Sequence, residues 1–294
     1  MKDTSAKNLL EILKLSTKYL SEHGIENPRL NAERLMAHVL NFSRVQLYLN
    51  YERPLQEDEL TGFRALLKRR AKHEPLQYIV GETEFMSLPF KVNPAVLIPR
   101  PETEILVEKT IEISKEKFDS QRELNILDIG TGSGNIAVSL AKNLLNATIT
   151  AIDVSADALK IASENALGNG VEDKIEFHKF DFLGSDFVKE SAEKFDVIIS
   201  NPPYVSEKEF QQLPDEVRSY EPLGALKDGS NGVVFFHKIA EISHKLLTDN
   251  GFVAVEVGMG QAPSVMDIFR KNNFAHIQLL KDLNGIERVV FGEF

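Results

Sequence analysis

A four-residue sequence, Asn201-Pro202-Pro203-Tyr204, directly follows a short apolar run at residues 195–200. The run is rich in β-branched residues and too short for a helix, which predicts a strand that is buried on both faces. The two prolines fix φ, remove two backbone donors and force Asn201 into an extended conformation. The sequence therefore predicts a stiff loop at the carboxyl end of a strand, and in an open α/β sheet this is the edge where ligands bind.

The groups of this loop suit a planar nitrogen group that must be held before it is methylated. Asn201 Oδ1 can accept one N–H of a substrate –NH₂ group, the Pro202 carbonyl can accept the other, and Tyr204 can stack on the flat face of the group. The alternative is a plain turn stiffened by proline. A cofactor site upstream in the chain would decide between the two.

The composition limits the classes of function. The chain of 294 residues carries 34 Lys+Arg against 44 Asp+Glu, and its net charge of −10 argues against a broad phosphate-binding surface. A local basic run from Arg64 to Lys72 stays open, either as a solvated face or as a contact with an acidic or RNA-bearing partner. The absence of cysteine excludes disulfides, thiolate catalysis and Cys-ligated metal sites.

Targeting and metal signals are also missing from the sequence. Residues 1–7 open no apolar segment of a signal peptide, and no stretch approaches the roughly 18 consecutive apolar residues of a membrane span. We therefore expect a soluble, cytoplasmic protein that does not bind membranes. His237 and His244 fall on one expected helix but lack the pattern of a third ligand, so we expect no metal site.

The first part of the chain predicts a small helical domain and a linker. Apolar residues recur at helical spacing over residues 4–50, and a further amphipathic helix is expected at Glu57–His73. Alternating apolar residues between Gln77 and Asn93 predict a β-hairpin. We place the helical domain at residues 1–75, the hairpin linker at 76–98 and a third region at 99–294, whose first helix spans Glu102–Ser114.

The rest of the chain alternates strand and helix patterns, which is typical of a parallel, doubly wound sheet. Two apolar runs flank Asn284-Gly285 near the end of the chain and predict a closing hairpin. The expected strands are 124–129, 148–152, 174–178, 195–200, 252–257, 277–280 and 288–291, and the expected helices are 135–143, 156–169, 233–247 and 262–271.

A glycine-rich loop, Asp128-Ile-Gly130-Thr131-Gly132-Ser133-Gly134-Asn135, joins the first of these strands to its helix. The glycines let the backbone approach a ligand closely, and the helix that follows begins with unpaired N–H groups. Asn135 occupies the place of the third glycine of the dinucleotide fingerprint, which argues against NAD. Asp153, at the end of the second strand, fits a carboxylate that accepts both ribose hydroxyls.

Asp181 and Phe182 follow the third strand, so four successive strands end in polar or aromatic groups at one edge of the sheet. Together these loops resemble those of the S-adenosylmethionine-dependent methyltransferases. The resemblance implies that Asp181 binds the adenine amino group, that Phe182 packs on the ring, and that Asp128 organises the loop near the methionine part. Asn201 would also border the cofactor, which leaves as S-adenosylhomocysteine.

The flanking sequences narrow the resemblance to the release-factor glutamine N5-methyltransferases, the HemK/PrmC family. This family implies a class I methyltransferase fold, with a mostly parallel sheet and an antiparallel last strand, after an N-terminal helical domain that docks the substrate. The stretches that carry the resemblance are Pro75–Gly81, Phe90–Glu104, Leu127–Ala137, Asn201–Tyr204, Tyr220–Leu226 and Asp228–Gly232.

The family resemblance implies a substrate and roles for the site residues. The substrate would be the glutamine of the Gly-Gly-Gln motif of class I peptide chain release factors, modified by a monomer that does not bind nucleic acid stably. Asn201, Pro202 and Tyr204 would be catalytic, and they would bind the substrate together with Pro203, Arg100 and Glu102. Two alternatives remain: an N-methyltransferase of RNA or DNA, and a non-catalytic cofactor-binding protein associated with translation.

Overall fold

The computed structural model describes residues 8–190, 193–282 and 284–294. The chain divides into two compact units. The helical unit contains the residues up to Gly81 together with Pro214–Tyr220, and the sheet unit contains Glu82–Leu213 and Glu221–Phe294. The sequence-based division placed the end of the helical domain at residue 75. None of the helices in the described part of the chain combines the length and apolar character needed to cross a bilayer.

The helices expected in the first part of the chain are present. The helical unit packs Leu9, Leu35 and Phe63, among other apolar residues, into its own core. Asn8 caps the first helix through its side chain, and Ser43 opens the third with a capping box. The helices are α1 (Leu9–Glu22), α2 (Pro28–Leu40), α3 (Arg44–Leu49), α4 (Glu57–Arg70), α5 (Leu76–Val80) and α11 (Asp215–Tyr220).

The basic run of α4 is partly structural. Arg70 is only 6% exposed and donates to Asn31, to the Glu74 carbonyl and to Glu216 of α11. Arg69 pairs with the Glu74 carboxylate. Arg70 therefore serves the packing of the helical unit, and a solvated face is wrong for it, whereas Arg69 is exposed.

The predicted hairpin is shorter than expected. Strands β1 (Glu82–Phe85) and β2 (Leu88–Lys91) pair antiparallel around a turn at Met86-Ser87, whose positive φ angles of 51° and 59° match a two-residue hairpin loop. The prediction of β structure at residues 77–80 was wrong, because these residues belong to α5. A short apolar run is ambiguous between helix and strand, and here packing of Leu76 and Ile79 in the helical core decides.

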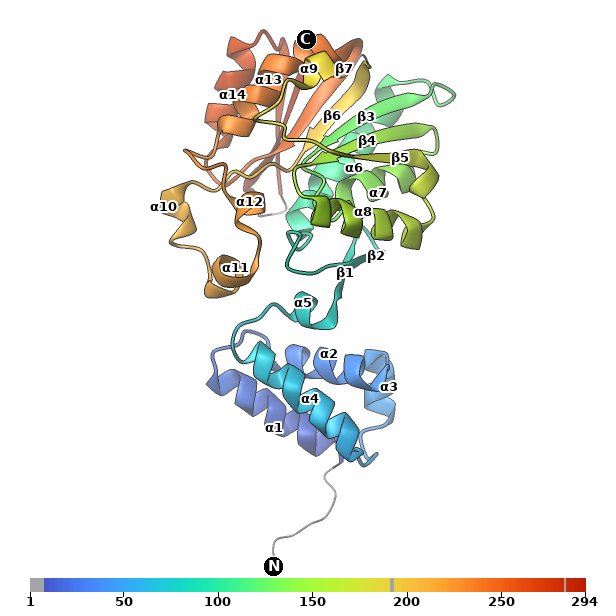
Figure 1. Ribbon diagram of the computed structural model, residues 1–294, viewed down its shortest axis with the longest axis vertical. Helices are drawn as coiled ribbons and strands as arrows, with labels where there is room; N and C mark the ends of the chain where they lie inside the picture. The colour runs from blue at the N-terminus through green and yellow to red at the C-terminus, as the bar shows by residue number, and fades with distance from the viewer. Residues whose placement is uncertain (1–7, 191–192, 283) are drawn as a thin grey trace, which may run out of the picture. The chain divides into compact units, whose positions relative to one another are not determined.

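The sheet unit has the predicted class I methyltransferase fold (Figure 1). Its described residues form a seven-stranded sheet in the order β5-β4-β3-β6-β7-β9-β8, in which β9 runs antiparallel to both neighbours and the strands from β5 to β7 are parallel. The strands are β3 (Leu124–Ile129), β4 (Ala147–Asp153), β5 (Ile175–Lys179), β6 (Phe195–Ser200), β7 (Leu247–Glu256), β8 (His276–Lys281) and β9 (Glu287–Glu293).

Helices cover both faces of this sheet, as Figure 1 shows. In β6, Val197 and Ile199 belong to the core on one face and Ile198 belongs to the core on the other. This explains why the strand is apolar at successive positions. Helices α6 (Pro101–Lys117), α7 (Asn135–Asn143) and α8 (Ala156–Asn169) lie on the first face, and α13 (Val234–Leu246) and α14 (Ala262–Lys271) lie on the second.

Short helices in the connections escaped prediction. They are η1 (Glu172–Lys174), α9 (Phe187–Glu190), α10 (Glu207–Phe210) and α12 (Leu223–Leu226). The closing hairpin of β8 and β9 is confirmed, with Asn284 and Gly285 in its loop; Leu283 lies outside the described residues. Segments of three or four residues carry too little periodicity to be read from one sequence.

The topology places the two predicted loops side by side. The chain runs from β3 outward through β4 and β5, and then returns to β6 on the other side of β3. Such a reversal of strand order is where open α/β sheets bind ligands. Ile129 at the end of β3 pairs with Ser200 at the end of β6, so the glycine-rich loop and Asn201 leave the sheet at adjacent positions on the same edge.

Candidate active site

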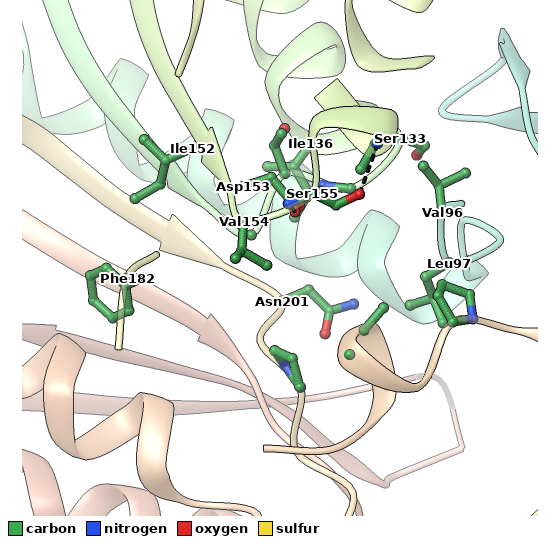
Figure 2. A pocket seen from close by; sticks show the side chains of 18 of the residues that line it. Val96, Leu97, Ser133, Ile136, Ile152, Asp153, Val154, Ser155, Phe182 and Asn201 are labelled. Atoms are coloured by element: carbon green, nitrogen blue, oxygen red, sulfur yellow. Dashed lines mark hydrogen bonds between the residues drawn. The ribbon is translucent and has the colours of Figure 1, made fainter. Parts of the chain in front are cut away.

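A cavity of about 480 Å³ lies at this edge of the sheet unit. Its wall is formed by the loops after β3, β4, β5 and β6, by the segment that leads into α6, and by residues of and around α12. Figure 2 shows Asn201 projecting from its loop into the space that Asp153, Val154 and Ser155 border from the other side. The cavity therefore joins the predicted cofactor loops to the predicted methyl-acceptor loop.

The glycine-rich loop is fixed against β4 by its own amides. The N–H groups of Gly130 and Thr131 both donate to the Ile152 carbonyl, at 2.9 and 3.0 Å, and the N–H of Gly132 donates to Asp153 Oδ2 at 2.9 Å. Gly130 and Gly132 have positive φ angles of 74° and 54°, which a residue with a side chain rarely adopts. These amides are used inside the protein, whereas a pyrophosphate site would direct such amides at its ligand.

The residues of the loop differ in whether they line the cavity. Thr131 and Ser133 line the cavity beside Gly130 and Gly132. Gly134 does not line it but forms the N-cap of α7, where its φ is 77°. A Cβ atom built on Gly134 would lie 3.0 Å from the Cβ atom of Ala162, so this glycine lets α7 and α8 approach closely.

Asp153 keeps acceptor capacity toward the cavity that it lines. Its Oδ1 atom accepts the N–H of Ser155 and its Oδ2 atom accepts the N–H of Gly132, each at 2.9 Å. Burial raises the pKa of this carboxyl, and the backbone amides of Ser155, Gly132 and Val154 oppose the rise. A carboxylate can accept about four hydrogen bonds, so Asp153 can still accept from a hydroxyl group of a ligand in the cavity.

Asp128 is fully buried below the loop and does not line the cavity. Burial raises its pKa to about 7, and the charge of Asp153 adds to the rise. The Thr131 hydroxyl and the Ala137 amide oppose it, but among the described residues neither carboxyl oxygen has a hydrogen bond of full geometry. A buried polar group without such a bond requires a reason. The role near the methionine part stays a prediction.

An apolar wall lies where the adenine ring was predicted. Phe182 is buried and stacks on Phe235, with ring centroids 6.1 Å apart and an angle of 13° between the planes. Asp181 is exposed and accepts the N–H of Gly184 at 3.0 Å. Val154, which the sequence reasoning missed, also lines the cavity although it is 60% exposed. An exposed valine next to Asp153 suits contact with a flat ring.

The Asn201 side chain is held by one hydrogen bond. Its Nδ2 atom donates to Thr103 Oγ1 at 3.0 Å, which leaves Oδ1 as the acceptor on the cavity wall. In the described part of the chain, no N–H or O–H group bonds to Asn201 Oδ1 or to the Pro202 carbonyl. The Ser200 hydroxyl donates to the Ile129 carbonyl at 2.7 Å, so the ends of β3 and β6 are tied together beside this loop.

The other residues of the tetrapeptide are anchored differently. Pro203 lines the cavity, while Pro202 and Tyr204 are not part of its wall. The Tyr204 hydroxyl donates to Glu256 Oε1 at 3.2 Å, and its carbonyl accepts Gln261 Nε2 at 2.8 Å. Burial raises the pKa of this phenol, which keeps it a neutral donor. Stacking of Tyr204 on the acceptor group stays a prediction.

Arg100 and Glu102 lie in different surroundings. Arg100 lines the cavity and pairs with Glu221, a buried carboxylate that also accepts the N–H of Ile98. Glu102 is not part of the cavity wall and lies 3.8 Å from a nitrogen of Arg288. The structure thus places Arg100 in the cavity wall, and the substrate contacts of Arg100 and Glu102 both stay predictions.

His237 and His244 both lie on α13. His244 packs edge-on against Phe294, with the ring centroids 5.0 Å apart. Within residues 8–190, 193–282 and 284–294, no group of three or more His, Cys, Asp or Glu side chains is arranged to hold a metal ion.

Comparison with solved structures supports the fold of the sheet unit. A methyltransferase from Pyrococcus furiosus is 18% identical and superimposes with a TM-score of 0.51, covering 71% of this chain and 89% of that one. The hMettl16 catalytic domain, in complex with the MAT2A 3'UTR hairpin 6, is 17% identical with a TM-score of 0.55, covering 78% of this chain and 82% of that one. Similarity at these identities concerns the fold alone.

Comparison of sequences is more specific. Residues 11–81 match the model of the PrmC N-terminal domain, and residues 106–216 match that of the methyltransferase small domain. The release factor glutamine methyltransferase of Fusobacterium nucleatum is 40% identical over 295 residues, covering 99% of this chain and 80% of that protein. Its counterpart in Geobacter sulfurreducens is 41% identical over 282 residues, with coverages of 96% and 95%. The chain belongs to the release factor glutamine methyltransferase family.

Proposed function

We propose that the protein transfers a methyl group from S-adenosylmethionine to the side-chain nitrogen, N5, of the glutamine in the Gly-Gly-Gln motif of class I peptide chain release factors. The observation that carries this proposal is the Asn201 amide. Its Nδ2 is used by Thr103, so its acceptor oxygen remains for a substrate –NH₂ group in the cavity that the glycine-rich loop borders. The names of the full-length relatives support the choice of substrate.

The residues of the cavity wall fit the cofactor. Asp153 has lone pairs for the ribose hydroxyls, and Val154 and Phe182 offer apolar surface to the adenine ring, next to Asp181. The engaged amides of the loop suit a ligand without a pyrophosphate. When bound, S-adenosylmethionine supplies an electrophilic methyl group on a sulfonium.

The protein's contribution to the reaction is mainly orientation. An amide nitrogen is a poor nucleophile because resonance spreads its lone pair into the carbonyl. Hydrogen bonds to Asn201 Oδ1 and to the Pro202 carbonyl would fix the –NH₂ group and aim the lone pair at the methyl carbon. The carbonyl oxygens also favour the partial positive charge of the transition state. Transfer of the methyl group from sulfur to N5 would make the nitrogen acidic, and its proton would leave to water, so these residues need not supply a strong general base.

The alternatives have less support. The net charge of −10 disfavours a nucleic-acid substrate, and the similarity to hMettl16 concerns the fold alone. A non-catalytic role would leave the free acceptors of Asn201 and Pro202 without a purpose. We expect the enzyme to work as a monomer in the cytoplasm, where release factors act on ribosomes, and without stable binding to nucleic acid.

Incubation of the purified protein with S-adenosylmethionine and a class I release factor tests the function. We expect mass spectrometry to find one added methyl group on the peptide that contains Gly-Gly-Gln. The matched control is a release factor in which this glutamine is replaced by asparagine, which keeps the amide but moves it back by one methylene. Methylation of RNA or DNA in place of the release factor would contradict the proposal.

Asp153→Ala is expected to weaken S-adenosylmethionine binding about tenfold to hundredfold, because hydrogen bonds to a charged group contribute roughly 1.5–3 kcal/mol. Calorimetric titration of both proteins measures the change. Asp157→Ala is the matched control, since Asp157 is exposed in the first turn of α8 and is not part of the cavity wall. Equal affinities of the Asp153 variant and the unchanged protein would remove Asp153 from the cofactor site.

A further inference from the structure

A buried carboxylate connects the two ends of the Asn201–Tyr204 loop. Thr103 Oγ1 accepts from Asn201 Nδ2 at 3.0 Å and donates to Glu256 Oε2 at 2.6 Å. The Tyr204 hydroxyl donates to the other oxygen, Glu256 Oε1, at 3.2 Å. Thr103 lies in the first turn of α6 and Glu256 at the end of β7, and they are 1% and 2% exposed. Two distant elements of the sheet unit thus hold one loop.

The Glu256 carboxylate determines which group donates and which accepts in the hydrogen bonds that run from Glu256 through Thr103 to Asn201. An ionised carboxylate only accepts hydrogen bonds, so both hydroxyls must donate to Glu256. Thr103 has one proton, which is then used, and it can offer only a lone pair to Asn201. The amide must therefore turn its –NH₂ group to Thr103. A reversed amide would place Oδ1 against the lone pair of Thr103 and would face the substrate –NH₂ with another –NH₂ group.

We propose that Thr103 and Glu256 are positioning residues, which set the orientation of the Asn201 amide and anchor Tyr204 for methyl transfer. Neither residue needs to contact the methyl group. Glu256 acts through Thr103 on Asn201, and Asn201 holds the acceptor nitrogen. The inference rests on the proposed function for the identity of that acceptor, but the orientation of the amide is a property of the protein alone.

The charge of Glu256 makes this arrangement sensitive to pH. Burial raises its pKa to about 7, and Glu102 on α6 adds to the rise. The hydroxyls of Thr103 and Tyr204 and the guanidinium of Arg288 on β9 oppose it. Protonated Glu256 would donate to one hydroxyl and allow Thr103 to turn its proton toward Asn201, which favours the reversed amide. A carboxyl with a raised pKa ionises as pH increases, so kcat is expected to rise with pH through about 7.

The variant Tyr204→Phe tests whether the pKa of Glu256, and not that of another group nearby, sets the pH profile of kcat. The variant removes one donor that lowers the pKa of Glu256, so the midpoint of the pH profile should move to higher pH. The pKa of Asp128 is also raised to about 7, but Tyr204 is not among the groups that shift it. A midpoint that is the same in both proteins would assign the profile to another group and contradict the role of Glu256.

The hydrogen bonds that connect Glu256 through Thr103 to Asn201 are called the relay here. The matched pair Thr103→Val and Thr103→Ser tests this relay by measurement of enzyme activity. Valine keeps the shape but cannot donate or accept, and we expect kcat to fall about tenfold to hundredfold, since the half-buried Asn201 amide and the buried Glu256 each lose a partner. Serine keeps the hydroxyl and should restore kcat to within about threefold, with S-adenosylmethionine affinity little changed in both. Equal kcat values for the two variants would show that the hydroxyl is not needed.

Nuclear magnetic resonance of protein labelled with ¹⁵N-asparagine tests the orientation without any substrate. The side-chain signal of Asn201 is assigned by its disappearance in Asn201→Ala. We expect its protons to exchange slowly and to shift with pH around 7 in the unchanged protein and in Thr103→Ser, and to exchange fast in Thr103→Val. An Asn201 signal that is the same in all three proteins would overturn the relay, even if release factors are methylated. A protein with the expected signals that methylates no release factor would overturn the proposed substrate alone.

Discussion

Asn201→Ala is expected to reduce methyl transfer on the order of a thousandfold, because the acceptor nitrogen loses the group that orients it. S-adenosylmethionine binding should fall only modestly, since Asp153 and the glycine-rich loop stay intact. Single-turnover transfer to a release factor measures the rate, and calorimetry measures the affinity. The effect should thus appear in kcat and leave the binding of the cofactor largely unchanged.

The control for this variant is Asn125→Ala. Asn125 lies in β3, where its side chain is exposed, and it is not part of the cavity wall. It should transfer methyl groups at the unchanged rate, because its backbone pairing in the sheet does not depend on the side chain. If Asn201→Ala retained a rate near that of Asn125→Ala, the assignment of the acceptor loop would be wrong.

Gly134→Ala is expected to lower the free energy of unfolding by about 2–5 kcal/mol. The positive φ of 77° costs a residue with a side chain about 1–2 kcal/mol, and overpacking adds about 1–3 kcal/mol. The new Cβ atom would lie 3.0 Å from the Cβ and 3.1 Å from the Cα of Ala162, so a neighbouring helix has to move. Urea unfolding measures the loss, and the displaced loop should also bind S-adenosylmethionine less tightly.

Gly168→Ala is the matched control on the neighbouring helix. Gly168 lies within α8, its φ is not positive, and no atom lies within 4 Å of a Cβ atom built on it. Alanine in a helix is better than glycine by about 0.5–1 kcal/mol, so this variant should be slightly more stable. The two substitutions should move the urea midpoint in opposite directions, and a common direction would contradict the close approach at Gly134.

Most of the sheet unit was predictable because its strands have an apolar sequence pattern and are also buried between two layers of helices. Residues 195–200 contribute Val197 and Ile199 to one core and Phe195 and Ile198 to the other, and the bounds 124–129, 135–143 and 156–169 agree with β3, α7 and α8. The glycine-rich loop and Asn201 were placed at one edge by the rule that parallel strands point the same way. By contrast, α5 depends on packing of Leu76 and Ile79 in the core of the helical unit, which no local pattern reveals.

The relay behind Asn201 was not predicted, although one signal was visible. Glu256 interrupts the apolar run Phe252–Val257, and a carboxylate inside a buried strand is rare unless it has partners. Thr103 gives no such signal, because a threonine in a first helical turn is ordinary. The hydrogen bond between Thr103 and Glu256 joins residues 153 positions apart, and the bond between Asn201 and Thr103 joins residues 98 positions apart. Only the folded topology brings such residues together.

The ion pair of the buried Arg70 affects whether the helical unit can be produced as a separate fragment. Its partner Glu216 belongs to Pro214–Tyr220, a segment that the chain reaches only after the Asn201–Tyr204 loop. A gene fragment that stops at Gly81 would encode Arg70 without this counter-ion, and removal of one partner from a buried ion pair is costly. The helical unit is therefore built from two separate segments of the chain. Recombination that exchanges it between homologues has to carry both pieces, which favours inheritance of the two units as one block.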